Sequence, residues 1–154
     1  MIVLEWYRFG MTPAAPEVHH LDLRLSYADC DPAQILYFAA WFPWMERVQT
    51  EWLYLNDLRQ DTLEDRFGFG TVTRHAECQY LAPARLFEKI RISLRVGHVG
   101  RTSFRWDTRM TRLDDGIVVA TGTTTLVTTD AGGRPIPVPS PLRELVEKAR
   151  PATG

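Results

Sequence analysis

Cysteine, long apolar runs and charge of one sign are all scarce in this sequence. Cys30 and Cys78 are the only cysteines in 154 residues, which is too few for a disulfide framework, and they form no C-x-x-C pair. No apolar run approaches the length of a membrane-spanning helix. The formal net charge is -1, with Lys, Arg, Asp and Glu scattered along the chain, so a nucleic-acid footprint and a polybasic membrane patch are excluded. We therefore expect a protein of the reducing cytoplasm with no nucleic-acid or membrane partner.

Several familiar catalytic motifs are also missing. There is no G-x-S-x-G elbow, and the Gly68-Phe69-Gly70 stretch is too short for a phosphate-binding loop and lacks a following lysine. His19 and His20 should face opposite sides of a strand, while His75 and His98 are isolated. Since no cysteine or carboxylate stands at ligand spacing from these histidines, we expect no metal site.

The composition suits one domain. With 45% hydrophobic and 11% aromatic residues, a chain of this length can bury a sizeable core. The first residues lack the basic region and long apolar core of a signal peptide, and Met11 offers an alternative start. We expect an N-terminal extension over residues 1–17 and a single domain over residues 18–150.

The first half of that domain reads as a strand followed by a long helix. Residues 18–27 alternate in polarity, as in a half-buried strand. Residues 39–55 carry apolar side chains at helical spacing. Proline is tolerated in the first turn of a helix, so Pro43 predicts a helix start close to Phe38. The strand residues expected on the inner face are Leu21, Leu23, Leu25 and Tyr27.

The second half reads as a short helical turn, four strands and a terminal helix. Asp114-Asp115-Gly116 is a tight hairpin signal. Ser140 should cap the last helix, with Pro141 at its first position. Consecutive strands joined by short turns predict an α+β fold in which one aromatic helix covers an antiparallel sheet. The four predicted strands lie within residues 71–83, 87–99, 100–113 and 117–130.

Two aspartates stand immediately before the long helix, in the stretch D-C-D-P-A-Q-I-L-Y-F of residues 29–38. We expect Asp29 to shape the turn. Asp31 precedes Phe38 by seven residues and would lie beside the free amides and positive dipole end of the helix. A carboxylate there could act as base or nucleophile next to an oxyanion hole. Cys30 has no histidine beside it to activate it, so we expect a small buried residue rather than a nucleophile.

The same stretch resembles the 4-hydroxybenzoyl-CoA thioesterase family. Y-x-D-C-D-P-A-x-I-x-Y-F with the following aromatic helix is its most specific motif, and Q-Y-L-A-P-A-R-L-F-E-K-I-R-I, G-R-T-S-F and residues 119–139 resemble three further family segments. The resemblance spans about residues 18–140. It implies the hotdog fold, an antiparallel β-sheet wrapped around one long central helix, here with a short C-terminal helix.

The resemblance also assigns the reacting groups. The family's catalytic aspartate matches Asp31, and its oxyanion-hole amide matches the backbone N–H of Phe38. Relatives usually carry glycine where this chain has Gln34, which either alters the loop or brings an amide to the thioester or to a water. Tyr37 and Trp41 belong to an aromatic load that suits a flat or hydrophobic acyl group, or that simply packs the core and a subunit interface.

Three further residues match family positions that contact the substrate. Glu46 lies where the aromatic-acyl branch has an acidic residue, although a solvated helix residue is an equal alternative. Arg101 and Ser103 match a segment near the coenzyme A phosphates or pantetheine, and an ordinary surface arginine is the alternative at Arg101.

These residues favour hydrolysis of an acyl-CoA thioester. A thiol leaving group, with a pKa near ~8.5, needs little general acid, so one carboxylate and amide donors suffice. Coenzyme A is then part of the substrate, and no cofactor is expected. A hydratase or dehydratase would need a histidine beside Asp31, and a non-catalytic acyl-CoA-binding or assembly module is the other alternative. The resemblance and the exposed edges of a small sheet imply a homodimer or homotetramer with active sites at the interface.

Overall fold

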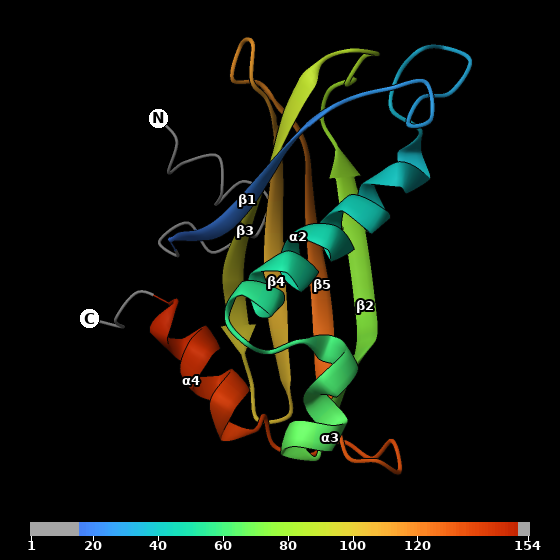
Figure 1. Ribbon diagram of the computed structural model, residues 1–154. Helices are drawn as coiled ribbons and strands as arrows, with labels where there is room; N and C mark the ends of the chain where they lie inside the picture. Colours follow the sequence, from blue (N-terminus) through green and yellow to red (C-terminus); the bar gives the residue numbers. More distant parts are fainter. Residues whose placement is uncertain (1–15, 151–154) are drawn as a thin grey trace.

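The structure is a computed structural model that describes residues 16–150, and it shows one five-stranded sheet with three α-helices (Figure 1). Every strand pair is antiparallel, and the strand order in the sheet is β1-β3-β4-β5-β2. The elements in chain order are β1 (Glu17–Arg24), η1 (Phe38–Ala40), α2 (Trp41–Leu55), η2 (Gln60–Thr62), α3 (Leu63–Phe67), β2 (Gly70–Tyr80), β3 (Lys89–Val99), β4 (Ser103–Arg112), β5 (Val118–Thr129) and α4 (Ser140–Lys148).

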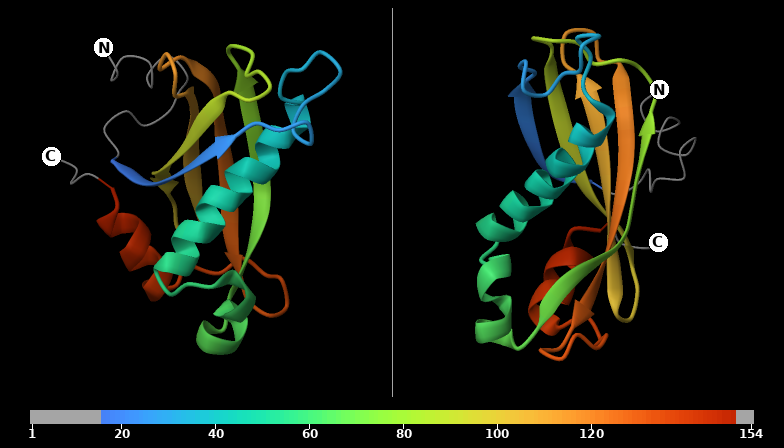
Figure 2. Two further views of the ribbon diagram at one scale, coloured as in Figure 1. Left: turned by 45° about the horizontal axis from the view of Figure 1, so that its top comes forward. Right: turned by 90° about the vertical axis from the view of Figure 1, so that its right-hand side faces the viewer.

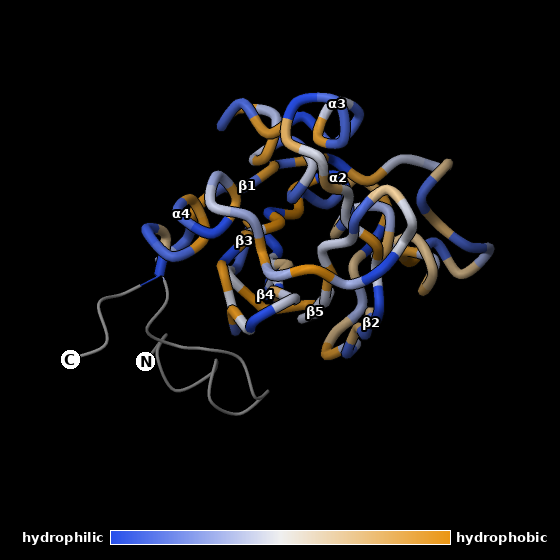
Figure 3. Tube along the Cα trace, turned by 90° about the horizontal axis from the view of Figure 1, so that it is seen from below, coloured by the Kyte–Doolittle hydropathy of each residue, from blue (hydrophilic) through white to orange (hydrophobic). Residues whose placement is uncertain are grey.

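The sheet curves around α2, which confirms the predicted hotdog fold. In Figure 2, right, α2 lies along one side of the sheet, and α3 and α4 lie toward one end of the molecule. In β3 and β4 apolar residues alternate with polar ones, as expected for strands with one face toward a helix. Figure 3 shows the elements from below, with hydrophobic and hydrophilic segments interspersed along the chain. The inward row of β4 is fully buried and packs edge-to-face: the rings of Phe104 and Trp106 are 5.3 Å apart, as are those of Trp52 and Trp106.

A glycine in β5 lets α2 approach the sheet closely. A Cβ built on Gly122 would lie 2.6 Å from both Sδ and Cε of Met45 and 3.0 Å from the carbonyl oxygen of Glu77. Met45 is itself 2% exposed and lies in the first half of α2. The missing side chain at Gly122 therefore sets the distance between helix and sheet at this point.

The helix start agrees with the interpretation of Pro43. η1 begins at Phe38 and α2 at Trp41, so Pro43 lies in the first turn of α2, where a missing N–H costs no internal hydrogen bond. The short second helix and the hairpin at Gly116, whose φ is 72°, are also confirmed.

Two local predictions are wrong. Tyr27 does not extend the inner face of β1, because the strand ends at Arg24 and the chain turns; the Tyr27 side chain is 75% exposed. Ser140 does not cap α4, because it is already helical; the cap residue is Pro139, and no side chain accepts a capping hydrogen bond. Of the predicted extension, residues 1–15 lie outside the described residues, and Glu17 belongs to β1.

The sheet has two distinct ends. At one end, Tyr80 of β2 pairs with Ala120, and the connections 25–37 and 81–88 meet. At the other end, Gly70 of β2 pairs with Thr129, and the β3–β4 hairpin lies nearby, since Ser103 pairs with Val127. Figure 1 shows the first end at the top and the second at the bottom. The 11 residues of β3 separate them by about 33 Å at the usual strand rise.

Candidate active site

Asp29 shapes the turn that follows β1, as predicted. Its Oδ2 accepts hydrogen bonds from both the backbone N–H and the hydroxyl of Ser26, each at 2.8 Å. Its carbonyl oxygen accepts the N–H of Tyr37 at 2.9 Å, eight residues later. Asp29 therefore ties together the two ends of the loop that carries Asp31.

Asp31 lies in a second turn inside this loop and keeps one carboxylate oxygen uncommitted. Oδ1 accepts the backbone N–H of Ala33 at 2.8 Å. The backbone of Asp31 is held as well, because its N–H donates to Ile35 at 3.0 Å and its carbonyl accepts from Gln34 at 2.9 Å. Within the described part of the chain, Oδ2 has no hydrogen-bond partner. The turn thus orients a partly buried carboxylate and leaves one oxygen available for chemistry.

The loop of residues 25–37 is hydrogen-bonded to the connection between β2 and β3. The N–H of Leu36 donates to Ala84 at 2.7 Å, and the N–H of Leu86 donates to the carbonyl of Gln34 at 3.0 Å. Gln34 has a φ of 61°, the left-handed conformation that favours glycine. The departure from glycine therefore leaves the loop in a glycine-like conformation and exposes an amide side chain on it.

The loop leads into a helix start whose first amides are free. The N–H of Ala40 donates to Tyr37 at 2.9 Å, but the N–H groups of Phe38 and Ala39 find no acceptor among residues 16–150. These are the orphan donors expected at a helix N-terminus, where the dipole is positive. Because no side chain caps η1, both donors remain available to an oxyanion.

An apolar pocket opens beside this helix start, with a volume of about 400 Å³. Of the predicted site residues, Phe38 and Trp41 lie in its wall: Phe38 is 60% exposed and Trp41 only 3%. Tyr37 does not line the pocket; its ring packs against that of Phe38, with the ring centroids 4.7 Å apart and the planes tilted by 56°. The complete lining is Ile35, Leu36, Phe38, Trp41, Tyr80, Leu81, Ala82, Pro83 and Ala84.

Glu46 lies one turn further along α2, outside the pocket. Its carboxylate accepts hydrogen bonds from the fully buried Gln49 amide and from Thr50, the latter at 2.9 Å. Both of these partners belong to α2 itself. Contact between Glu46 and an acyl group stays a prediction.

Arg101 and Ser103 lie at the opposite end of the sheet from Asp31 in the same chain. Arg101 is exposed in the β3–β4 hairpin, where its carbonyl accepts the N–H of Val138 at 2.8 Å. Ser103 pairs with Val127 at the start of β4. One chain therefore does not bring these two residues to the Asp31 loop, and their role in binding coenzyme A stays a prediction that needs a second subunit.

The two thiols are held in their protonated forms. Burial, and then the neighbouring charges of Asp29 and Asp31, raise the pKa of Cys30. Burial raises the pKa of Cys78 to about 11, despite a hydrogen bond with Tyr80. Neither thiol is therefore activated as a nucleophile. Among residues 16–150, no three His, Cys, Asp or Glu side chains gather as metal ligands would.

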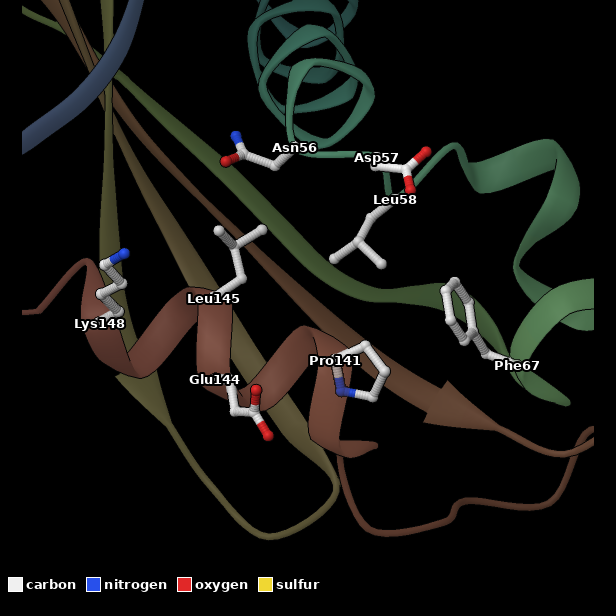
Figure 4. Close-up of a pocket in the computed structure, with 8 residues that line it drawn as sticks. All are labelled: Asn56, Asp57, Leu58, Phe67, Pro141, Glu144, Leu145 and Lys148. Carbon is white, nitrogen blue, oxygen red and sulfur yellow. The ribbon is translucent and has the colours of Figure 1, made fainter.

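A second cavity, of about 320 Å³, lies at the other end of α2 (Figure 4). Leu58, Phe67 and Leu145 project into the space between the end of α2 and α4. Its rim carries Asp57, which pairs with Arg66 at 2.8 Å, together with Glu144 and Lys148. This cavity lies at the opposite end of α2 from the loop that carries Asp31, so the pocket lined by Phe38 and Trp41 is the candidate site.

A comparison with known protein families identifies the family of this chain. The profile of the Thioesterase-like superfamily matches residues 25–146, which include the Asp31 loop, α2 and the whole of β2 to β5. The chain belongs to the Thioesterase-like superfamily. A search of curated proteins found no significant match to it.

Solved structures of thioesterases share the fold of this thioesterase-like chain. The 1,4-dihydroxy-2-naphthoyl-CoA thioesterase from Synechocystis is 19% identical, with a TM-score of 0.76, over 83% of this chain and 94% of that one. A gentisyl-coenzyme A thioesterase is 22% identical, with a TM-score of 0.70, over 80% and 98%. A thioesterase from Thermus thermophilus, complexed with coenzyme A and Zn, is 27% identical, with a TM-score of 0.72, over 88% and 98%.

The sequence prediction missed one contact in this thioesterase-like site. The Tyr80 hydroxyl donates a hydrogen bond of 2.8 Å to the carbonyl of Phe38. Tyr80 begins the tyrosine-x-x-proline-alanine segment, which predicted a turn but not a hydrogen-bond partner 42 residues away.

Among the described residues, no helix combines the length and the apolar character needed to span a bilayer.

Proposed function

We propose that this member of the Thioesterase-like superfamily hydrolyses acyl-CoA thioesters to a free acid and coenzyme A. The observation that carries the proposal is the Asp31 turn: one carboxylate oxygen is fixed by Ala33 at 2.8 Å and the other is free, on a loop that leads into the unpaired N–H groups of Phe38 and Ala39. A reacting carbon between these groups would have an attacking group on one side and oxyanion donors on the other.

Two routes to hydrolysis are open to these groups. Asp31 takes a proton from water, which then attacks the thioester carbon, or its Oδ2 attacks that carbon directly to form an anhydride that water opens. In either route the C–S bond breaks and the thiolate leaves without a general acid, since its own pKa is near ~8.5. A single turnover in oxygen-18 water separates the routes, because only the anhydride route can leave label in Asp31.

The acyl group is proposed to occupy the pocket of about 400 Å³ beside Phe38 and Trp41. Its apolar wall and the aromatic rings at its mouth suit a hydrophobic or flat aromatic acyl chain. The narrower likeness to 4-hydroxybenzoyl-CoA thioesterases is part of this proposal. It is supported by two structural neighbours, a 1,4-dihydroxy-2-naphthoyl-CoA thioesterase and a gentisyl-coenzyme A thioesterase.

A homodimer, alone or within a homotetramer, would complete the site. β2 is an edge strand whose residues 72–77 are all exposed, and an exposed edge invites pairing. Two β2 strands paired antiparallel about a two-fold axis would place the Gly70 end of one subunit beside the Tyr80 end of the other. That arrangement turns the hairpin end of the partner sheet, with Arg101 and Ser103, toward the end that holds Asp31. Light scattering of the purified protein tests the assembly.

Free-thiol release from short-chain, long-chain and aromatic acyl-CoAs tests the activity. Hydrolysis of at least one of these groups is expected, with hydrophobic or aromatic acyl groups preferred. If no thiol is released but a non-hydrolysable acyl-CoA ether binds, the protein is the alternative, a non-catalytic acyl-CoA-binding module. An acyl-carrier-protein thioester is tested beside the CoA thioesters, and the faster rate of hydrolysis shows which of the two carriers the enzyme prefers.

A further inference from the structure

The first turn of the long helix receives a hydrogen bond from the sheet in addition to its own backbone hydrogen bonds. The N–H of Ala40 donates to the carbonyl of Tyr37 at 2.9 Å. The carbonyl of Ala39 cannot accept from Pro43, which has no N–H, and instead accepts from the N–H of Trp41. The sheet supplies another at this point: the Tyr80 hydroxyl donates to the Phe38 carbonyl at 2.8 Å.

The Phe38 carbonyl and the Ala39 N–H belong to one peptide group. In a trans peptide the C=O and the N–H lie in one plane and point in opposite directions. A donor held on the Phe38 oxygen therefore fixes the direction of the Ala39 N–H, which has no acceptor among the described residues. It also polarises that peptide, because hydrogen bonds in a chain strengthen one another.

Tyr80 is placed and protonated for this task. It ends β2, lines the same pocket as Phe38 and Trp41, and is 49% exposed. Burial, and then the neighbouring Cys78, raise the pKa of Tyr80. Its hydroxyl therefore remains a donor through neutral and mildly alkaline pH.

We propose that Tyr80 is a positioning residue of this thioesterase: its hydroxyl holds the Phe38–Ala39 peptide so that the Ala39 N–H joins the Phe38 N–H as a second oxyanion donor. The proposal rests on the proposed function and deepens it. It gives the sheet a role in activating the thioester that acts through the Phe38–Ala39 peptide.

The variant Tyr80→Phe keeps the ring in the pocket wall and removes the hydroxyl. Loss of an oxyanion donor costs about 10²–10³ in kcat. In this variant the Ala39 N–H remains but is no longer held, so we expect a smaller loss, about tenfold in kcat with little change in KM. Tyr54→Phe is the matched control, because Tyr54 is 60% exposed near the end of α2 and does not line the pocket.

A spectroscopic measurement separates positioning from a merely structural role. In an Asp31→Asn background, benzoyl-CoA labelled with carbon-13 at its carbonyl stays intact, and infrared difference spectra report the carbonyl stretch of the bound thioester. Two oxyanion donors lower that frequency. Adding Tyr80→Phe should return part of the shift toward the value in water, and adding Tyr54→Phe should leave it unchanged.

The outcomes are distinct. A lower kcat together with a smaller carbonyl shift supports the proposal. An unchanged kcat, or a lower kcat with an unchanged carbonyl shift, overturns the role of Tyr80 while leaving a hydrolysing wild type as a thioesterase. A wild type that neither hydrolyses nor polarises any acyl-CoA overturns the proposed function, and the role of Tyr80 with it.

Discussion

Replacing Gln34 by glycine should stabilise the fold, whereas the same replacement at Gln79 should destabilise it. Gln34 has a φ of 61°, and this left-handed conformation costs a non-glycine residue about 1–2 kcal/mol. Glycine itself lowers the free energy of unfolding by about 0.5–1 kcal/mol, because it has more conformational freedom than glutamine in the unfolded chain. We therefore expect Gln34→Gly to raise the free energy of unfolding by about 0.5–1 kcal/mol.

Gln79 supplies the matched control for this prediction. It is exposed in β2 opposite Thr121, so glycine there brings only the entropy cost of about 0.5–1 kcal/mol. The midpoints of urea unfolding should move in opposite directions with unchanged slope. Destabilisation of Gln34→Gly as large as that of Gln79→Gly would refute the reasoning, because it would show that the loop stores no strain that glycine relieves.

The same variants decide what the Gln34 side chain does. If its amide contacts the thioester or a water, both Gln34→Gly and Gln34→Ala lose activity. If Gln34 acts only through the loop conformation, Gln34→Gly keeps full activity. Gln34→Ala retains the left-handed strain without the amide, so it separates these two effects.

Two further predictions follow from the packing of α2 and from the buried thiol. Gly122→Ala should destabilise the fold by about 1–3 kcal/mol through overpacking against Met45. Combining it with Met45→Ala should remove part of that cost. If the losses of unfolding free energy of the two single variants simply add in the double variant, the contact between Gly122 and Met45 is contradicted. Burial raises the pKa of Cys78 to about 11 in the folded protein. The protonated thiol should therefore add to the free energy of unfolding at pH values below its unfolded pKa, and this contribution should be lost as the pH rises toward 11. Chemical unfolding of wild type and Cys78→Ala between about pH 7 and the raised pKa should show the two stabilities converging on the alkaline side, and a constant difference would contradict the shift.

Features encoded over a few residues were predictable from the sequence. Pro43 with the helical spacing of the tryptophans located the start of α2. The turn role of Asp29 was predictable from the preference of aspartate for turns, and the structure shows its carboxylate acting on Ser26, three positions away. An antiparallel sheet covered by one helix followed from the order of one strand, one long helix and four strands joined by short connections. The hotdog fold itself was implied by the resemblance to the 4-hydroxybenzoyl-CoA thioesterase family.

Features set by contacts distant in sequence were not predictable. β1 ends before Tyr27 because the Leu25 backbone pairs with Phe87 and Glu88, more than 60 residues away. The contact between Tyr80 and Phe38 depends on where β2 ends relative to the helix. The separation of Arg101 from Asp31 depends on the direction of β3, which a resemblance between short motifs does not contain.

The most direct test of the account compares Asp31→Asn with Asp29→Asn in the thiol-release assay. Asparagine can accept the Ala33 N–H as Asp31 does and the Ser26 donors as Asp29 does, so both variants should stay folded. We expect Asp31→Asn to lower kcat by about 10²–10⁴, the usual contribution of a base, and Asp29→Asn to stay within about tenfold of wild type because its role is structural. Hydrolysis by Asp31→Asn at the wild-type rate would contradict the central claim that Asp31 performs the chemistry.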